Sequence, residues 1–96
     1  MSKVIDKAVA ALNDRLSGNG FDSVAKFVLD GAGSIVIDAG GAREGDDAAD
    51  VTLTASAEVF EQILAGELNP TAAFMSGRLA VDGDMGAAMR LGSLLA

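Results

Sequence analysis

The sequence contains no cysteine, histidine, tyrosine or tryptophan, and its four aromatic residues are all phenylalanine. Without cysteine there is no disulfide or iron–sulfur chemistry, and without histidine zinc, copper and haem lose their usual ligands as well. A general base near neutral pH would have to be a carboxylate or a lysine with a shifted pKa, and a serine nucleophile would lack its usual imidazole partner. These absences leave carboxylate chemistry open, but they favour a protein that is not an enzyme and needs no cofactor.

Basic residues are also scarce, because seven Lys and Arg stand against fourteen Asp and Glu, a net charge of −7. Nucleic acids are bound by clustered basic side chains, and anionic membranes attract basic segments. We therefore expect no nucleic-acid partner and at most transient membrane contact.

The sequence has no apolar run that approaches the length of a membrane span, which is about 20 residues. Charges at Lys3, Asp6 and Lys7 are unlike a signal peptide. A cytoplasmic protein is expected, with its oligomeric state left open.

Half of the 96 residues are hydrophobic, so the chain is too apolar for disorder. The length fits a single domain, residues 1–96. Helical spacing near the N-terminus predicts a first helix that Ser2 caps and residues 17–20 end. Its apolar face comprises Ile5, Val9, Leu12 and Leu16.

Period-two alternation predicts strands at about residues 25–30, 34–38 and 50–55, with a short edge strand near 42–44. A helix follows from Ser56 to Gly66. A short helix that Asn69 caps follows, then a strand over 78–82 and a terminal helix that Asp84 caps. The order of helix, strands, two helices, strand and helix predicts an α+β fold, with an antiparallel-rich sheet covered by helices on one face.

Two clusters of acidic residues invite a calcium-site interpretation, one at Asp46, Asp47 and Asp50 and the other at Asp82 and Asp84. Neither has the spacing of a twelve-residue calcium loop with a terminal glutamate. We interpret the first as a solvated acidic loop and Asp84 as a helix cap. The glycines of residues 31–33 lie between two strands and do not open a helix, so they predict a hairpin turn and no phosphate site.

The last helix is unusually apolar, because Arg90 is its only charged residue between positions 85 and 96. Such a helix could line an internal cavity, form a subunit interface, or simply expose alanine. Three of the four methionines, Met75, Met85 and Met89, lie in this last quarter of the chain. Flexible thioethers fill gaps in a core and also suit variable apolar ligands.

From residue 49 onward the chain resembles the sterol carrier protein type 2 family. The matching segments are Ala49-Asp50-Val51-Thr52-Leu53-Thr54, Gly66, Leu68-Asn69-Pro70, Ala73-Phe74, Gly77-Arg78-Leu79, Gly83-Asp84-Met85-Gly86 and Ala88-Met89-Arg90-Leu91. These segments keep a fixed spacing over the second half of the chain. The first 48 residues match only in element order and in Asp30-Gly31.

The resemblance implies a five-stranded, mostly antiparallel twisted sheet with helices covering one face and an apolar tunnel between them. It also implies a non-catalytic intracellular carrier of a sterol, fatty acid, acyl-CoA or similar apolar ligand. Phe74, Met85 and Met89 fall at positions that lie near the tunnel in the family. The candidate ligand-binding residues are Phe27, Phe60, Ile63, Leu64, Phe74, Met75, Leu79, Val81, Met85 and Met89.

The chain departs from the family pattern in three ways. Residues 33–39 lack the aromatic often seen there, which leaves the size of the ligand open. The chain ends at Leu94-Leu95-Ala96 without a basic peroxisomal signal, and no catalytic domain is fused to it, so we expect a free-standing cytoplasmic protein. The alternative function is a protein-interaction or dimerisation module whose apolar C-terminal helix packs on another protein or subunit.

Overall fold

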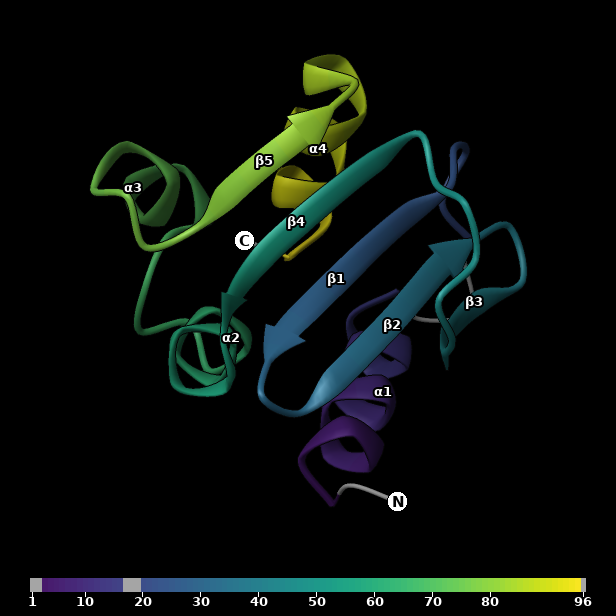
Figure 1. Ribbon diagram of the computed structural model, residues 1–96, viewed down its shortest axis with the longest axis horizontal. Coiled ribbons are helices and arrows are strands. Elements are labelled where there is room, and N and C mark those ends of the chain that lie inside the picture. The colour runs from purple at the N-terminus through teal and green to yellow at the C-terminus, as the bar shows by residue number, and fades with distance from the viewer. Residues whose placement is uncertain (1–2, 17–19, 96) are drawn as a thin grey trace.

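The computed structural model describes residues 3–16 and 20–95, and its elements follow the predicted order (Figure 1). They are α1 (Lys3–Leu16), β1 (Ala25–Asp30), β2 (Gly33–Asp38), β3 (Gly41–Glu44), β4 (Val51–Ser56), α2 (Ala57–Leu64), α3 (Pro70–Met75), β5 (Ala80–Gly83) and α4 (Met85–Leu95). The predicted cap at Ser2 and residues 17–19 of the predicted helix stop lie outside the described residues.

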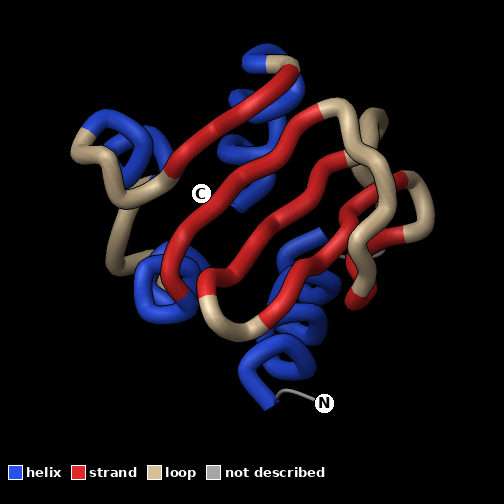
Figure 2. The backbone as a smooth tube through the Cα atoms, viewed as in Figure 1, coloured by secondary structure: helices blue, strands red, loops and turns tan. Residues whose placement is uncertain are grey.

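The five strands form one sheet in the order β3-β2-β1-β4-β5. Strands β1 and β4 pair in parallel, and the other three pairings are antiparallel, which confirms the mostly antiparallel sheet. The β1–β2 hairpin turns through Gly31 and Gly33, whose φ angles of 80° and 141° favour glycine. The helices gather on one side of the sheet, and α3 lies beside the start of β5 (Figure 2).

The core lies between the sheet and the helices. The strand alternation is as predicted, and it buries Ala25, Phe27 and Leu29 of β1 together with Val51, Leu53 and Ala55 of β4. The buried face of α1 consists of Ile5, Ala8, Leu12 and Leu16. Ala8 therefore takes the central position expected for Val9, which is only partly buried at the edge of the core.

The last strand begins two residues later than predicted, at Ala80 instead of residue 78. The N–H groups of Arg78 and Leu79 both donate to the carbonyl of Ala73, at 2.9 and 3.1 Å. Because these donors close the end of α3, they are not available to the β4 ladder. Leu79 is nevertheless buried under the sheet, as its alternation predicted.

The loop between β3 and β4 covers part of the outer face of the sheet (Figure 1). Val36 points to this face and is completely buried there, close to the backbone of Gly45. Lys26, on the same face, forms an ion pair of 2.9 Å with Asp46. The acidic loop, which was predicted to be merely solvated, therefore shields one apolar side chain of the sheet.

A second ion-pair group fixes the hairpin that precedes this loop. Arg43 binds Asp38 at 2.7 Å and Asp47 at 3.1 Å. The hydrogen bond from Arg43, with a second from the Gly40 N–H, lowers the pKa of Asp38 below its usual value. These groups are exposed to solvent, so their contribution to folding is small.

Strand β3 is an edge of the sheet, and Asn13 of α1 covers part of that edge. The Asn13 Nδ2 donates to the Ala42 carbonyl at 3.0 Å, and the Ala42 N–H donates to Asn13 Oδ1 at 2.9 Å. The side-chain amide thus makes both bonds that a neighbouring strand would make. Such protection reduces edge-to-edge pairing with another chain.

We expect Asn13→Asp to lower the free energy of unfolding by about 0.5–1.5 kcal/mol, because a carboxylate cannot donate to the Ala42 carbonyl. The two residues have similar helix propensity, so the helix itself is little affected. Urea denaturation in about 0.5 M salt, where the added charge is screened, measures the loss. An unchanged free energy of unfolding would show that this bond contributes nothing.

Candidate functional site

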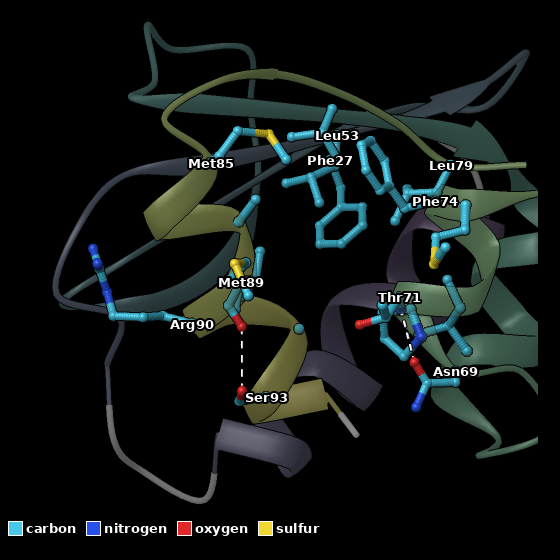
Figure 3. Close-up of a pocket in the computed structure, with 17 residues that line it drawn as sticks. Phe27, Leu53, Asn69, Thr71, Phe74, Leu79, Met85, Met89, Arg90 and Ser93 are labelled. Atoms are coloured by element: carbon cyan, nitrogen blue, oxygen red, sulfur yellow. Dashed lines mark hydrogen bonds between the residues drawn. The ribbon is translucent and has the colours of Figure 1, made fainter. Parts of the chain in front are cut away.

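A pocket of about 640 Å³ opens between α3 and α4 on the helical side of the sheet (Figure 3). This volume is typical of small-molecule sites. Its deep part is formed by the buried residues Phe27, Leu53, Ile63, Pro70, Leu79, Ala88 and Leu91. Its rim is formed by Asn69, Thr71, Phe74, Met75, Val81, Met85, Met89, Arg90, Gly92 and Ser93.

The register of three strands builds the roof of the pocket. Phe27 of β1 lies opposite Leu53 of β4, and Leu53 lies opposite Val81 of β5. Paired residues on neighbouring strands point to the same face, so the three side chains form one row above the helices. Val81 is the least buried of the three, because it sits on the edge strand at the pocket.

The N-terminus of α4 is fixed by Gly83 and Asp84. Asp84 Oδ1 accepts a hydrogen bond from the Ala87 N–H at 3.2 Å, which confirms the predicted cap, and the Asp84 N–H donates to the Asp50 carbonyl at 2.9 Å. Gly83 has a φ of 108°, and a Cβ there would clash with the carbonyl oxygen of Asp50. Glycine therefore permits the close approach that sets where α4 begins.

We expect Asp84→Ala to lower the free energy of unfolding by about 0.5–2 kcal/mol, because the Ala87 N–H loses its acceptor. Asp84→Asn should change it little, since asparagine caps comparably. Thermal and urea unfolding of the two variants measure the difference. If Asp84→Asn removed ligand binding at an unchanged melting temperature, Asp84 would contact the ligand and the capping role would be insufficient.

Arg90 holds the middle of α4 to the segment that precedes β1. Its Nε donates to Asp22 Oδ1 at 3.2 Å, and its Nη2 donates to Ser23 Oγ at 3.0 Å. The guanidinium also lies 6.0 Å from the centre of the Phe21 ring, within the range of a cation–π contact. Arg90 therefore extends away from the centre of the pocket (Figure 3) and positions the helix that forms one wall.

The opposite wall is the short helix α3. Asn69 caps it as predicted, since its Oδ1 accepts from the Thr71 N–H at 2.8 Å and from the Ala72 N–H at 3.4 Å. Pro70 occupies the first helical turn, where its missing N–H has no consequence. Phe74 points from this helix toward the gap that faces α4 (Figure 3).

The apolar residues of α4 form two groups, one in the core and one at the pocket. Ala87, Ala88 and Leu91 are buried against the core, whereas Met85 and Met89 are exposed at the rim of the pocket. The cavity interpretation of this helix is thus the one that the geometry matches. The second interpretation, a subunit interface, concerns the same exposed methionines, and the third, exposed alanine, does not apply to Ala87 and Ala88, which are buried.

Eight of the ten predicted ligand-binding residues line the pocket. They are Phe27, Ile63, Phe74, Met75, Leu79, Val81, Met85 and Met89. Phe60 and Leu64 do not line this pocket. Phe60 is buried and packs against the Phe27 ring, with centroids 4.8 Å apart, because the α2 stripe turns it into the core. Leu64 packs at the edge of the core, and its carbonyl accepts a hydrogen bond from Arg15.

The predicted set missed nine lining residues, which are Leu53, Asn69, Pro70, Thr71, Ala88, Arg90, Leu91, Gly92 and Ser93. The sequence held a signal for three of them. Ala88 and Gly92 each follow a predicted methionine at i+3, so they lie on the same helix face as Met85 and Met89. The alternation also placed Leu53 inward. Only the three-dimensional structure brings the polar rim residues to the pocket.

The chemistry of the lining favours binding by burial. Arg90 is its only charged residue, and the guanidinium is engaged by Asp22 and Ser23. Asn69 uses its oxygen as a helix cap, and Ser93 Oγ donates to the Met89 carbonyl at 3.2 Å. Within residues 3–16 and 20–95, no cluster of acidic residues is arranged to hold a metal ion. In the same part of the chain, no helix has the length and apolarity to cross a membrane.

The sequence model of the SCP-2 sterol transfer family matches residues 4–96. The chain belongs to this family. The family match confirms the resemblance seen in the second half of the sequence, and it extends that resemblance to the first half. The SCP-2 fold is also confirmed as an α+β fold with a five-stranded sheet. The tunnel that the family implies stays a prediction, because the structure shows a pocket with an exposed rim.

Solved SCP-2 structures share this fold along nearly the whole chain. Sterol carrier protein 2 from Aedes aegypti, solved in complex with the C16 fatty acid palmitate, is 27% identical with a TM-score of 0.79, and the match covers 100% of this chain and 97% of that one. The sterol carrier protein domain 2 of Helicoverpa armigera is 26% identical with a TM-score of 0.77, covering 96% of this chain and 85% of that one.

Curated relatives include much longer proteins. Peroxisomal multifunctional enzyme A of Dictyostelium discoideum is 42% identical over 78 residues, which is 81% of this chain and 17% of that protein. Hydroxysteroid dehydrogenase-like protein 2 of Danio rerio is 44% identical over 61 residues, which is 62% of this chain and 15% of that protein. The matched segments thus make up less than a fifth of either relative, and the similarity concerns one domain of each.

Proposed function

We propose that this chain is a non-catalytic lipid carrier that holds an apolar ligand, such as a fatty acid, a sterol or the acyl chain of acyl-CoA, in the pocket between α3 and α4. The observation that supports this proposal is the pocket itself. About 640 Å³ is enclosed by phenylalanine, leucine, isoleucine and methionine side chains, and its polar groups lie at the rim. Such a lining gains free energy from each methylene that leaves water.

Two further observations support this choice. The Aedes aegypti relative was solved with palmitate, and its fold superimposes along the whole chain. The lining contains no carboxylate, lysine or histidine that could act as a general acid or base. We therefore propose binding without conversion, and we do not extend the activities of the longer relatives to this chain.

The expected affinity is in the micromolar range. Burial of about 15 methylenes at roughly 0.8 kcal/mol each gives about 12 kcal/mol. Loss of translational freedom and ordering of the chain cost at least about 4 kcal/mol. At most about 8 kcal/mol remains, which corresponds to a dissociation constant of about one micromolar or weaker. This affinity suits a carrier that must also release its cargo.

Mass spectrometry of solvent extracts from natively purified protein tests the proposal. We expect a co-purifying fatty acid, sterol or acyl lipid at a substantial fraction of one molecule per chain. The Gly92→Phe variant, purified in the same way, should carry much less. Lipid-free wild-type protein that also fails to take up added lipid would contradict a carrier function.

The alternative function is an interaction module, and the exposed Met75 and Met89 are the observation that favours it. In that case light scattering should show a mass above that of one chain, and substitutions at these two residues should lower it.

The proposed location of the protein is the cytoplasm. One relative is a peroxisomal enzyme by name, so imaging of the tagged protein tests this part.

A further inference from the structure

The rim of the pocket contains all the methionines that the structure describes. Met75, Met89 and Met85 line the pocket, and they are exposed to solvent by 81%, 72% and 45%. Met75 belongs to α3 and the other two belong to α4, so sulfur atoms lie on both walls of the opening. Peroxides convert accessible methionine to the sulfoxide. A dissolved oxidant can therefore reach all three side chains.

The sequence offers such an oxidant few other targets. It contains no Cys, His, Tyr or Trp, and its fourth methionine is Met1. Thiols and thioethers are the side chains that two-electron oxidants attack most readily. The buried core of the described chain contains no methionine. Oxidation of the folded protein is thus directed at the pocket and leaves the core unchanged.

We propose that Met75, Met85 and Met89 form an oxidation site, at which conversion of the thioether to the sulfoxide lowers the affinity of the pocket for lipid. This inference rests on the proposed carrier function, because lipid affinity is the property that the modification changes. The oxidant is a peroxide, for which hydrogen peroxide is the probe.

The chemical step transfers one oxygen atom from hydrogen peroxide to sulfur. A sulfur lone pair attacks one peroxide oxygen, so an S–O bond forms while the O–O bond breaks. The hydroxide that leaves takes up the proton of the transferred oxygen and becomes water. Sulfur is oxidised by two electrons, and the peroxide is reduced by the same two. Methionine sulfoxide reductases reverse the change with thiols as the reductant, so the modification is reversible.

The sulfoxide lowers affinity because it adds a polar group to a lining that binds by burial. Figure 3 shows the Met85 side chain extending from the start of α4 toward Leu53, and Met89 follows one turn later on the same face. A lipid chain that covers a sulfoxide oxygen removes water from it and offers no hydrogen bond in return, which opposes binding. Met75 is the most exposed of the three, so its oxygen can turn to solvent and should matter least.

Bound lipid should in turn protect the site. An acyl chain in the pocket keeps water and peroxide away from the sulfur atoms that line it. Protection should be greatest at Met85, which is the least exposed of the three, and smallest at Met75. Peroxide therefore acts mainly on empty protein, which then loses its capacity to load lipid, while loaded protein is modified more slowly.

Peptide mass spectrometry after treatment with hydrogen peroxide tests where the full chain is oxidised. We expect one added oxygen at each of the three methionines, fastest at Met75, then at Met89, and slowest at Met85, because the exposed fractions decrease in this order. Saturating palmitate, whose acyl chain has no double bond to be oxidised, should slow the reaction at Met85 more than at Met75.

Displacement of a fluorescent fatty acid by palmitate, after removal of the peroxide, compares reduced and oxidised protein. Oxidised wild-type protein should bind at least about tenfold more weakly, or about 1.4 kcal/mol, at an unchanged melting temperature. Treatment with methionine sulfoxide reductases and a thiol should restore the affinity. Met85→Gln, which is polar without any oxidant, should weaken binding in the same direction.

The matched control is the triple variant with Met75→Leu, Met85→Leu and Met89→Leu. Leucine keeps the volume and the apolar character of methionine, so the reduced variant should bind palmitate like wild-type protein. Met1 is then the only sulfur left in the chain, and it reports the effect of oxidation away from the pocket. Peroxide should leave the affinity of this variant unchanged.

The inference is overturned if peroxide leaves the three methionines unmodified, or if the triple variant loses affinity as wild-type protein does. A lowered melting temperature of the oxidised protein, together with normal binding by Met85→Gln, would also overturn it. If reduced protein binds palmitate and oxidised protein binds it equally well, the carrier function stands and the oxidation inference fails. If reduced wild-type protein binds neither palmitate nor any other lipid, the carrier function itself fails, and this inference fails with it.

Discussion

Replacement of Gly92 by phenylalanine should lower lipid affinity at least tenfold, about 1.4 kcal/mol, in a protein that remains folded. Gly92 lies on the face of α4 that lines the pocket. A Cβ added there would be 3.8 Å from the Pro70 Cβ, an ordinary van der Waals contact. A benzyl group continuing in this direction would enter the gap between α4 and α3, which is the space assigned to the ligand.

Stability should be retained in this variant, because the pocket has room and glycine is a poor helix residue. Gly92→Ala is the matched control, and it should raise the free energy of unfolding by about 0.5–1 kcal/mol with affinity unchanged. Met89 is a less useful position for added bulk, because 72% of that residue is exposed and a larger side chain can turn to solvent. Ligand titration and urea unfolding of both Gly92 variants provide the measurements.

If Gly92→Phe destabilised the protein by about 1–3 kcal/mol, the region would be close-packed core, in which added volume is poorly tolerated. If the variant were stable and bound lipid normally, the ligand would have to lie elsewhere. Either result would contradict the assignment of the pocket.

Phe27→Ala should have the largest effect on folding, with a loss of about 3–5 kcal/mol in the free energy of unfolding. Phe27 is buried on the central strand β1, where it contacts the Phe60 ring and reaches the deep part of the pocket. Its removal would leave a cavity that the surrounding sheet cannot close. Small domains have only about 5–15 kcal/mol of stability, so the variant should be close to unfolding.

Chemical denaturation measures this loss, and Phe27→Leu offers a milder variant if the alanine protein does not fold. Thr54→Ala, at an exposed position on the neighbouring strand, serves as control and should change the free energy by less than about 1 kcal/mol. A loss below about 1.5 kcal/mol for Phe27→Ala would show that Phe27 is not a central part of the core.

Local patterns were sufficient to predict most of the fold. Alternation at residues 25–30 and 50–55 identified the two central strands, since a half-buried strand must place every second residue inward. The helix starts at Ser56, Asn69 and Asp84 were predictable because their side chains satisfy free N–H groups of the first helical turn.

Local patterns were insufficient where contacts outside the element itself determine where a strand begins or which side chain is covered. The Ala73 carbonyl takes the N–H groups of Arg78 and Leu79, so the last strand begins later than its alternation suggests. Alternation places Val36 on the face of the sheet opposite Ile35 and Ile37, and it does not show that the loop after β3 covers Val36 there. Neither contact leaves a periodic signal in the sequence.

In the candidate site too, local sequence patterns identify some residues, and contacts between distant residues decide the placement of others. Phe74 and the methionines at residues 75–89 could be selected from the family resemblance and from helical spacing. Phe60 could not be separated from them, because a stripe of apolar residues does not reveal which member faces the core and which faces a cavity. The role of Arg90 in holding α4 to Asp22 depends on a contact across 68 positions of the chain.

Titration of the purified wild-type chain with palmitate tests the central claim most directly. Displacement of a fluorescent fatty acid, followed in vesicle-free buffer, should give saturable binding at one site per chain with a dissociation constant on the micromolar scale. Gly92→Ala should bind equally well and Gly92→Phe at least tenfold more weakly. If palmitate displaces nothing from wild-type protein up to its solubility limit, and no other apolar lipid does so, the chain is not a lipid carrier.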